Sequence, residues 1–365
     1  ENKAMSDHQT GTGPAPKIAI VGAGALGGYV GGYLTRDGHD VTLIDMWPEN
    51  VEAMRGPGLE LTGLTEPENF TVRTNAIHLT ELQAVSKTRP FDIAFVAVKS
   101  YDTEWATSMI AQYLGPAGFV VSLQNSINED RIAQVVGWGK TVGCIASRIA
   151  VELHEPGKIR RMVALGGEAH TIFRVGETHG RTTPRAILIR DMLASIDSAR
   201  VTSNLWGERW SKLCINCMRN PVSAATGRGG NANDQDPVTR RLAIMLAGEA
   251  VKIGLAQGYE LEKMYGLTPE QLAAAHDGAN KAFVECEETL LAGTKGRSDR
   301  QRPSMGQDMQ KGRRTEIDYL NGLVAARAAE LGIAAPYNAG MADVVRRVER
   351  GEIAASPEAV AHLVP

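Results

Sequence analysis

One stretch of the chain combines a lysine and two amides at helical spacing. In NLWGERWSKLCINCMRNP, Lys212, Asn216 and Asn220 recur every four residues, so they share one face of a predicted helix whose other positions are mostly apolar. Asparagine is a weak helix former and an unusual choice for a face that only meets water. A lysine withdrawn from water has a lowered pKa, as a general acid at neutral pH requires. The pattern suggests a site that binds and protonates a carbonyl oxygen, and a solvated polar stripe is the ordinary alternative.

A second cluster of polar residues lies in RPSMGQDMQKGRRTEIDYLNG, residues 302–322. Ser304 precedes a short predicted helix, where a serine can cap the first turn. Glu316 falls in the first turn of the next predicted helix, where the helix dipole favours an acid. Both residues could equally face a substrate. The spacing alone leaves these two interpretations open.

Near its start the chain carries KIAIVGAGALGG, which combines a short apolar strand, three spaced glycines and a helix. Gly22 permits the tight turn, Gly24 lets the backbone approach a phosphate, and Gly27 lets the helix pack against the strand. The free N–H groups at the start of the helix favour an anion there. A glycine-rich turn without a ligand is the alternative, but the flanking strand and helix argue against it. We therefore expect the pyrophosphate of a dinucleotide to bind at Gly22, Gly24, Ala25, Leu26 and Gly27.

Three further residues end predicted parallel strands, and open parallel sheets bind ligands beyond the carboxyl ends of their strands. Asp45 ends the strand after the glycine turn, at the spacing of an acid that accepts hydrogen bonds from the adenosine ribose. Lys99 ends FDIAFVAVK, and Asn125 ends GFVVSLQN. Lys99 could contact a cofactor or simply reach water, and Asn125 could line the floor of a cleft or form a turn.

The order of apolar segments predicts two architectures in one chain. Up to about residue 203, strands alternate with helices, which is typical of an α/β doubly wound sheet of the Rossmann type. The short strands predicted between residues 149 and 201 are expected to form the edge of this sheet. From Leu205 onward the patterns are helical, so we expect an all-α second domain and a substrate cleft between the two. The expected divisions are a flexible leader at 1–15, a dinucleotide-binding domain at 16–203, a helical substrate and catalytic domain at 204–352, and a C-terminal tail at 353–365. The predicted helices are 205–218, 239–257, 269–291, 315–331 and 338–350, and a glycine-rich polar loop is expected at 226–237.

Bulk composition excludes several classes of protein. A chain of 365 residues with a formal net charge of −3 has room for two cores and no bias toward nucleic acid or an anionic membrane. Four cysteines are too few for a disulfide scaffold, and the pair Cys214 and Cys217 lacks further ligands for a zinc site. No apolar run approaches the ~18 residues of a membrane span, and the polar leader lacks the apolar core of a signal peptide. We expect a reduced, cytoplasmic protein without a bound metal.

Together these motifs resemble those of the ketopantoate reductases (2-dehydropantoate 2-reductases), which reduce ketopantoate to pantoate with a nicotinamide cofactor. The resemblance runs from about residue 17 to about residue 350 and rests on GAGALGG, VKSYDT, LQN, EPGKI, W-S-K-L-x-x-N-x-x-x-N and P-S-M-x-Q-D…G-R-x-T-E-I-D-Y-L-N-G. It implies a Rossmann-type N-terminal domain and an all-α C-terminal domain like that of 6-phosphogluconate dehydrogenase. It also implies a part in pantothenate biosynthesis.

The resemblance further implies a role for each polar residue. Lys212 would be the general acid that protonates the ketone oxygen, and Glu316 would bind the distal hydroxyl of the substrate and hold the lysine in place. Lys99 would lie near the cofactor, as would Asn125 on its nicotinamide side. The residues that would bind and orient the substrate are Asn125, Asn216, Asn220 and Ser304.

Two departures from the family pattern bear on cofactor and substrate. Family members mostly use NADP and carry an arginine just past the second strand, where this chain has Asp45. An aspartate accepts from a ribose 2′-hydroxyl and repels a 2′-phosphate, which favours NAD over NADP. The usual Gln-Asn-Gly becomes Gln124-Asn125-Ser126. An NAD-dependent dehydrogenase of another hydroxy acid, in a catabolic pathway, is thus an alternative to ketopantoate reduction, and a non-catalytic NAD(P)-binding sensor is a lesser one. The long apolar helix at 239–257 could pair two chains in a homodimer.

Overall fold

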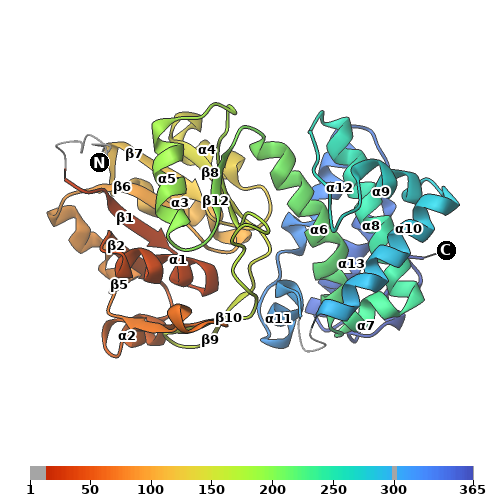
Figure 1. Ribbon diagram of the computed structural model, residues 1–365, viewed down its shortest axis with the longest axis horizontal. Coiled ribbons are helices and arrows are strands. Elements are labelled where there is room, and N and C mark those ends of the chain that lie inside the picture. The colour runs from red at the N-terminus through yellow and green to blue at the C-terminus, as the bar shows by residue number, and fades with distance from the viewer. Residues whose placement is uncertain (1–13, 298–301, 365) are drawn as a thin grey trace, which may run out of the picture. The chain divides into compact units, whose positions relative to one another are not determined.

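The computed structural model describes residues 14–297 and 302–364, which form two compact units (Figure 1). The first unit comprises the described residues up to Ala97 together with Met109–Val121 and Ala150–Ala164. The second unit comprises Val98–Ser108, Ser122–Ile149 and the described residues from Leu165 onward. Most of the expected leader lies outside the described residues, and the expected domain limits near residues 203 and 352 stay predictions.

The first unit is built on a central sheet of largely parallel strands. Its strands are β1 Lys17–Val21, β2 Asp40–Asp45, β5 Asn75–His78, β6 Phe91–Val96 and β7 Leu114–Ser122, in the order β7-β6-β1-β2-β5. β1 pairs in parallel with both β2 and β6, and β2 pairs in parallel with β5. Ile20 and Phe95 in the two central strands are fully buried, as expected where a parallel sheet is covered on both faces. The parallel Rossmann-type core is confirmed.

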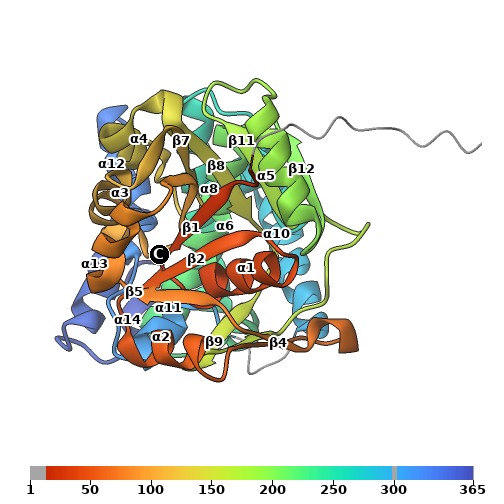
Figure 2. The same cartoon turned by 90° about the vertical axis from the view of Figure 1, so that its left-hand side faces the viewer.

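The helix α1, Ala25–Arg36, follows the glycine turn and packs through its glycines against two sheets. On one side a Cβ at Gly31 would lie 2.3 Å from Cδ2 of Leu43 in β2. On the other side Gly28 meets Ile159 of a four-stranded sheet with the order β4-β3-β10-β9. Figure 2 shows α1 beside β2, with this second sheet below it. The strands of the second sheet are β3 Leu59–Thr62, β4 Phe70–Val72, β9 Val151–Glu155 and β10 Lys158–Arg161.

The sequence pattern predicts that the short strands after residue 149 extend the main sheet. Two of them, β9 and β10, belong to the four-stranded sheet instead. β10 pairs in parallel with β3 and antiparallel with β9, with Ile159 opposite Leu61. The prediction of edge strands is therefore wrong for β9 and β10. The cause is a pairing between segments far apart in the chain. A pattern of alternating apolar residues reports which face of a strand is buried but not which strand lies beside it.

The second unit contains three strands, β8 Thr141–Ala146, β11 Phe173–Glu177 and β12 Ala199–Thr202, in the order β12-β11-β8. β11 is antiparallel to β8 and parallel to β12. Two helices pack against these strands: α4 Glu129–Val136 against β8, and α5 Pro184–Ala194 against β11 and β12. The helix α3, Thr103–Ala111, lies between β6 and β7 in the chain.

The remainder of the second unit is helical, as the sequence predicts. Its core lies between α6 and α8, which run side by side (Figure 1) and bury Leu213 and Leu246. α8 is also covered by α9 and α13 of the same chain, so the apolar pattern that suggested a dimer surface is accounted for within one chain. The helices are α6 Leu205–Thr226, α7 Gly230–Gln235, α8 Pro237–Ala256, α9 Pro269–His276, α10 Asn280–Ala292, α11 Ser304–Gln310, α12 Asn321–Glu330, α13 Pro336–Glu349 and α14 Glu358–Ala361.

The helix α6 extends past its predicted end at residue 218 and contains Pro221. Because proline has no N–H, the carbonyl four residues earlier, that of Cys217, loses its helical partner. The side chain of Asn321 donates from Nδ2 to this carbonyl oxygen at 3.1 Å. The helix therefore continues to Thr226 and ends at Gly227, which has a φ of +70°.

Three other predicted segments differ in detail. The predicted helix at 269–291 is divided into α9 and α10 near Gly278, whose φ of +89° breaks a right-handed helix. The loop expected at 226–237 contains α7, and the helix expected at 315–331 begins as a 3₁₀ turn, Ile317–Tyr319, before α12. Within the described ranges no helix is both long and apolar enough to cross a membrane.

Candidate active site

The glycine turn between β1 and α1 has the geometry that the sequence predicts. Gly22 has a φ of +95°, and a Cβ at Gly27 would lie 2.0 Å from the carbonyl oxygen of Gly22. Both positions therefore require glycine for the fold itself. At Gly24 an added Cβ would meet nothing within 4 Å. The space beside Gly24 and the N–H groups that open α1 suit a phosphate group, so the residues present fit a dinucleotide.

Asp45 lies beside this turn. The N–H of Gly22 donates to the carbonyl oxygen of Ile44 at 2.9 Å, which joins the glycine turn to the end of β2. The Asp45 carboxylate accepts hydrogen bonds from the backbone N–H of Trp47 at 2.9 Å and from Nδ2 of Asn50 at 3.3 Å. Burial raises the pKa of Asp45, and these hydrogen bonds oppose the rise.

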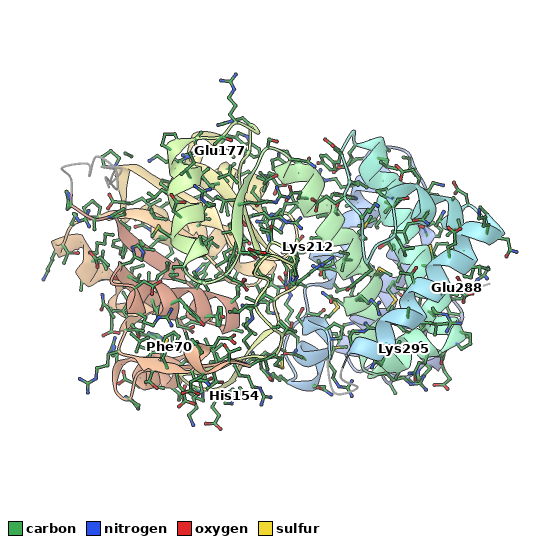
Figure 3. All side chains as sticks on the ribbon, in the orientation of Figure 1. Phe70, His154, Glu177, Lys212, Glu288 and Lys295 are labelled. Atoms are coloured by element: carbon green, nitrogen blue, oxygen red, sulfur yellow. The ribbon has the colours of Figure 1, made fainter. Side chains whose placement is uncertain are left out.

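In the second unit, Lys212 projects from the N-terminal half of α6, where Figure 3 marks it. Its ammonium donates to the carbonyl oxygen of Ala146 at the end of β8. Burial lowers the pKa of Lys212 to about 7, with a further contribution from the guanidinium of Arg209, while Cys144 and Glu316 act in the opposite direction. A lysine with this pKa can give up or accept a proton near neutrality.

Asn216 and Asn220 lie one and two turns further along the same helix. Asn220 is 7 % exposed. The Nδ2 atom of Asn216 is buried and has no hydrogen-bond partner within the described part of the chain. Buried amide groups nearly always have a partner, so an unpaired one beside a lysine is where a ligand oxygen is expected.

Glu316 belongs to a buried network that also contains Lys99. One oxygen of Glu316 accepts from the backbone N–H of Ser100 at 2.9 Å and from its hydroxyl at 2.8 Å, and the other lies 3.7 Å from Nζ of Lys99. Nζ of Lys99 also donates to Asp308 at 2.6 Å. Burial alone would lower the pKa of Lys99, but the carboxylates of Glu316 and Asp308 raise it above its usual value. Lys99 therefore stays charged.

Asn125 joins the same network through its backbone. Its carbonyl oxygen accepts from Nδ2 of Asn128 at 2.8 Å and from the hydroxyl of Ser100 at 3.4 Å. The next residue, Ser126, has a φ of +67°, in the left-handed region that favours glycine, and its hydroxyl donates to the carbonyl oxygen of Tyr319. The serine at this position is therefore strained and hydrogen-bonded at once.

Two local interpretations made from the sequence are wrong. Pro303, not Ser304, occupies the cap position of α11, and Ser304 is its first residue. Glu316 precedes the 3₁₀ turn instead of lying in the first turn of α12. Among the described residues, Asn216, Asn220 and Ser304 share no hydrogen bond with the Lys99–Glu316 network. No group of three potential metal ligands occurs in the described ranges.

Sequence reasoning missed two residues of this site. Asp308 is four residues after Ser304 on α11, and this helical spacing could have placed it on the same face. Arg209 is three residues before Lys212, and its side chain is 1 % exposed. It donates to Glu129 at 2.8 Å from Nε and to the carbonyl oxygens of Gln124 and Ser122 at 2.6 and 3.0 Å. The sequence does show an arginine among the apolar residues of this helix, which indicates a buried charge. Its partners could not be deduced from the sequence, because they lie about 80 residues away.

A strand, glycine turn and helix, followed by an acid that ends the next parallel strand, is the arrangement of dinucleotide-dependent oxidoreductases. A profile described as ketopantoate reductase PanE/ApbA matches residues 18–172, and one described as ketopantoate reductase PanE/ApbA C terminal matches residues 204–349. The chain belongs to the ketopantoate reductase PanE/ApbA family, whose members are NAD(P)-dependent oxidoreductases that act on a CH–OH group.

Individual relatives agree with this assignment. The chain is 30% identical to a 2-dehydropantoate 2-reductase of Pyrococcus horikoshii over 88% of its own length and 94% of that protein's. It is 28% identical to that of Archaeoglobus fulgidus, covering 92% and 98%. A PanE/ApbA family ketopantoate reductase from Ralstonia eutropha superimposes with a TM-score of 0.73 at 27% identity, covering 92% and 99%. A D-mandelate dehydrogenase solved with NADH and anilino(oxo)acetate shares the fold, with a TM-score of 0.74 at 22% identity and coverage of 92% and 99%.

The buried pair Arg209–Glu129 generates a prediction about stability. Changing Glu129 to Gln leaves the Arg209 charge without its counterion and should lower the free energy of unfolding by about 3 kcal/mol. Urea denaturation of the variant measures this loss. As a control, Glu330→Gln removes a partner of Arg327 from a pair in which the Glu330 side chain is 61% exposed, and should cost less than about 0.5 kcal/mol. Equal effects of the two changes would contradict the prediction.

Proposed function

We propose that this protein transfers a hydride between a nicotinamide cofactor and a 2-oxo or 2-hydroxy acid, and that its reaction is the reduction of 2-dehydropantoate to pantoate. The observation that carries the proposal is the pKa of about 7 at Lys212, on the same helix as the unpaired amide of Asn216. The names of the relatives that are 28% and 30% identical support the substrate.

In the proposed mechanism the bound cofactor supplies the hydride, and the side chains of this chain supply position, charge and one proton. Lys212 donates its proton to the ketone oxygen as that oxygen gains negative charge. Asn216 donates to an oxygen of the substrate from its free Nδ2. Asn220 and Ser304 orient the substrate, and Asn125 separates it from the nicotinamide. Orientation of this kind lowers the entropic part of the barrier.

Glu316 and Lys99 have supporting roles in this mechanism. Glu316 receives the distal hydroxyl of the substrate and, as a negative charge, favours the protonated form of Lys212. Lys99 holds a positive charge near the cofactor, since Asp308 and Glu316 keep it protonated. In this mechanism Lys212 exchanges a proton with the substrate, whereas Lys99 stays protonated and provides a positive charge.

The proposed cofactor is NAD in preference to NADP. Two hydrogen bonds already orient the carboxylate of Asp45 at the end of β2, and a carboxylate repels the 2′-phosphate that distinguishes NADP. The same residue supports the second candidate function, oxidation of a different 2-hydroxy acid with NAD. The fold shared with a D-mandelate dehydrogenase solved with NADH is compatible with this alternative.

The two candidates are separated by an assay of 2-dehydropantoate with NADH and with NADPH, followed by the loss of cofactor absorbance. We expect turnover with both and a higher kcat/KM with NADH. The absence of turnover with either cofactor, together with intact cofactor binding, would contradict 2-dehydropantoate as the substrate. A panel of 2-hydroxy acids with NAD then tests the second candidate.

Lys212→Ala should lower kcat by about 10²–10⁴-fold, because the reaction loses its general acid. The dissociation constant for the cofactor, measured by calorimetry, should stay within about twofold of the original value, since the proposed role of Lys212 is to protonate the substrate and not to hold the cofactor. Lys252→Ala serves as the control, because this lysine is on α8 and pairs with Asp277 at the surface. A non-catalytic sensor has no turnover to lose, and a general acid other than Lys212 would leave kcat unchanged.

The pKa of Lys212 sets a pH dependence whose sign differs between the two directions. Reduction needs the protonated amine, so its kcat/KM should fall about tenfold per unit as the pH rises above about 7. Oxidation needs the neutral amine, so its kcat/KM should rise about tenfold per unit as the pH approaches 7 from below and level off above about 7. In Lys212→Arg the guanidinium stays charged, and the transition near pH 7 should vanish. A transition that survives this change would belong to another group.

A further inference from the structure

Asn50 is a fully buried amide that connects three separate parts of the first unit. It lies on α2, Pro48–Arg55, directly after β2. Its Nδ2 donates to the carbonyl oxygen of Ala23 in the glycine turn at 3.1 Å and to Asp45 at 3.3 Å. Its Oδ1 accepts from the backbone N–H of Gly157 at 2.8 Å. One side chain therefore links the phosphate-binding turn, the acid at the end of β2 and the β9–β10 hairpin.

The contacts of Asn50 restrict the carboxylate of Asp45. Asn50 holds one carboxylate oxygen, and the N–H of Trp47 holds the other at 2.9 Å. The backbone N–H groups of Met46 and Ala23 also stabilise this carboxylate, and a ribose hydroxyl would use the acceptor capacity that remains. A carboxylate held at both oxygens cannot turn aside to admit a larger anionic group.

The hairpin explains why Asn50 can hold this position. Gly157 has a φ of +70°, and a Cβ there would lie 2.7 Å from Cβ of Ala53 on α2. Its carbonyl oxygen accepts from the N–H of Glu60 in β3 at 2.8 Å. Only glycine brings the N–H of the hairpin this close to α2. The EPGK turn, a motif to which the sequence assigns no chemistry, thereby supports the side chain that orients Asp45.

We propose that Asn50, held by the N–H of Gly157, is a positioning residue that sets the preference for NAD over NADP by fixing the Asp45 carboxylate toward the adenosine ribose. The proposal rests on the preference for NAD proposed above. It adds that Asp45 alone does not determine selectivity. An aspartate free to rotate would discriminate less against a 2′-phosphate, because it could move away from the added charge.

The test is direct binding of NAD⁺ and NADP⁺ to the full chain by calorimetry, which needs no substrate. Asn50→Ala should weaken NAD⁺ binding about tenfold, the effect of one hydrogen bond to a charged group. NADP⁺ binding should change by less than about twofold, so the ratio of the two dissociation constants falls. Asn75→Ala is the matched control, because Asn75 donates to Thr42 in the same sheet at 3.0 Å and does not touch Asp45. It should leave the ratio unchanged.

A double-mutant cycle separates positioning from a general structural role. If Asn50 acts through Asp45, adding Asn50→Ala to Asp45→Ala should cost no further affinity for NAD⁺. Additive losses, or equal losses for both cofactors in Asn50→Ala, would overturn the proposal. Asn50→Ser, which keeps a small polar side chain in the buried position, replaces Asn50→Ala if thermal melting shows that the alanine variant does not fold. Tighter binding of NADP⁺ than NAD⁺ by the unmodified protein would overturn the cofactor preference and this proposal together, whereas failure to reduce 2-dehydropantoate would overturn only the substrate.

Discussion

The second unit depends on the burial of one guanidinium. Arg209 is surrounded by acceptors, and each comes from the segment that leads from β7 into α4: two backbone carbonyls and the carboxylate of Glu129. Moving an unpaired charge out of water costs several kcal/mol, so the ion is tolerated only with this set of partners in place. That requirement fixes α6 against the segment that carries Asn125. The same positive charge lies one helical turn from Lys212 and helps to depress its pKa. Burial is the larger cause of the lowered pKa of Lys212, and the Arg209 interaction adds to it while also fixing the position of the helix that carries the lysine.

The carboxylate of Glu316 and the amine of Lys99 are both paired within the second unit, in contrast to the amide nitrogen of Asn216. One oxygen of Glu316 accepts hydrogen bonds from the N–H and the hydroxyl of Ser100. The amine of Lys99 lies close to the carboxylates of Asp308 and Glu316. Such a network holds its members in one arrangement, because any displacement would leave a buried polar group unsatisfied. Nδ2 of Asn216, by contrast, is buried with its hydrogen-bonding capacity unused among the described residues. In the proposed mechanism an oxygen of the substrate gives this group its partner.

Much of the fold could be predicted from the sequence because it depends on local signals. The glycine turn requires a positive φ at Gly22 and a missing Cβ at Gly27, and both requirements appear directly as residue types. The polar face of α6 likewise appears as a spacing of four. What could not be predicted depends on distant partners. The continuation of α6 past Pro221 rests on Asn321, and the burial of Arg209 rests on Glu129. Nothing near either residue in the sequence identifies these contacts.

The two lysines of the site show why residue type and spacing do not suffice to assign chemistry. Both are withdrawn from water, which by itself lowers the pKa of an amine. At Lys99 the carboxylates of Asp308 and Glu316 outweigh this effect, and the pKa rises. At Lys212 the ammonium meets a neutral carbonyl, Arg209 adds a second positive charge nearby, and the pKa falls to about 7. Only Lys212 can therefore change its protonation state during a reaction at neutral pH. The distinction lies in the partners that the fold brings to each amine, so it becomes visible only when the tertiary structure is known.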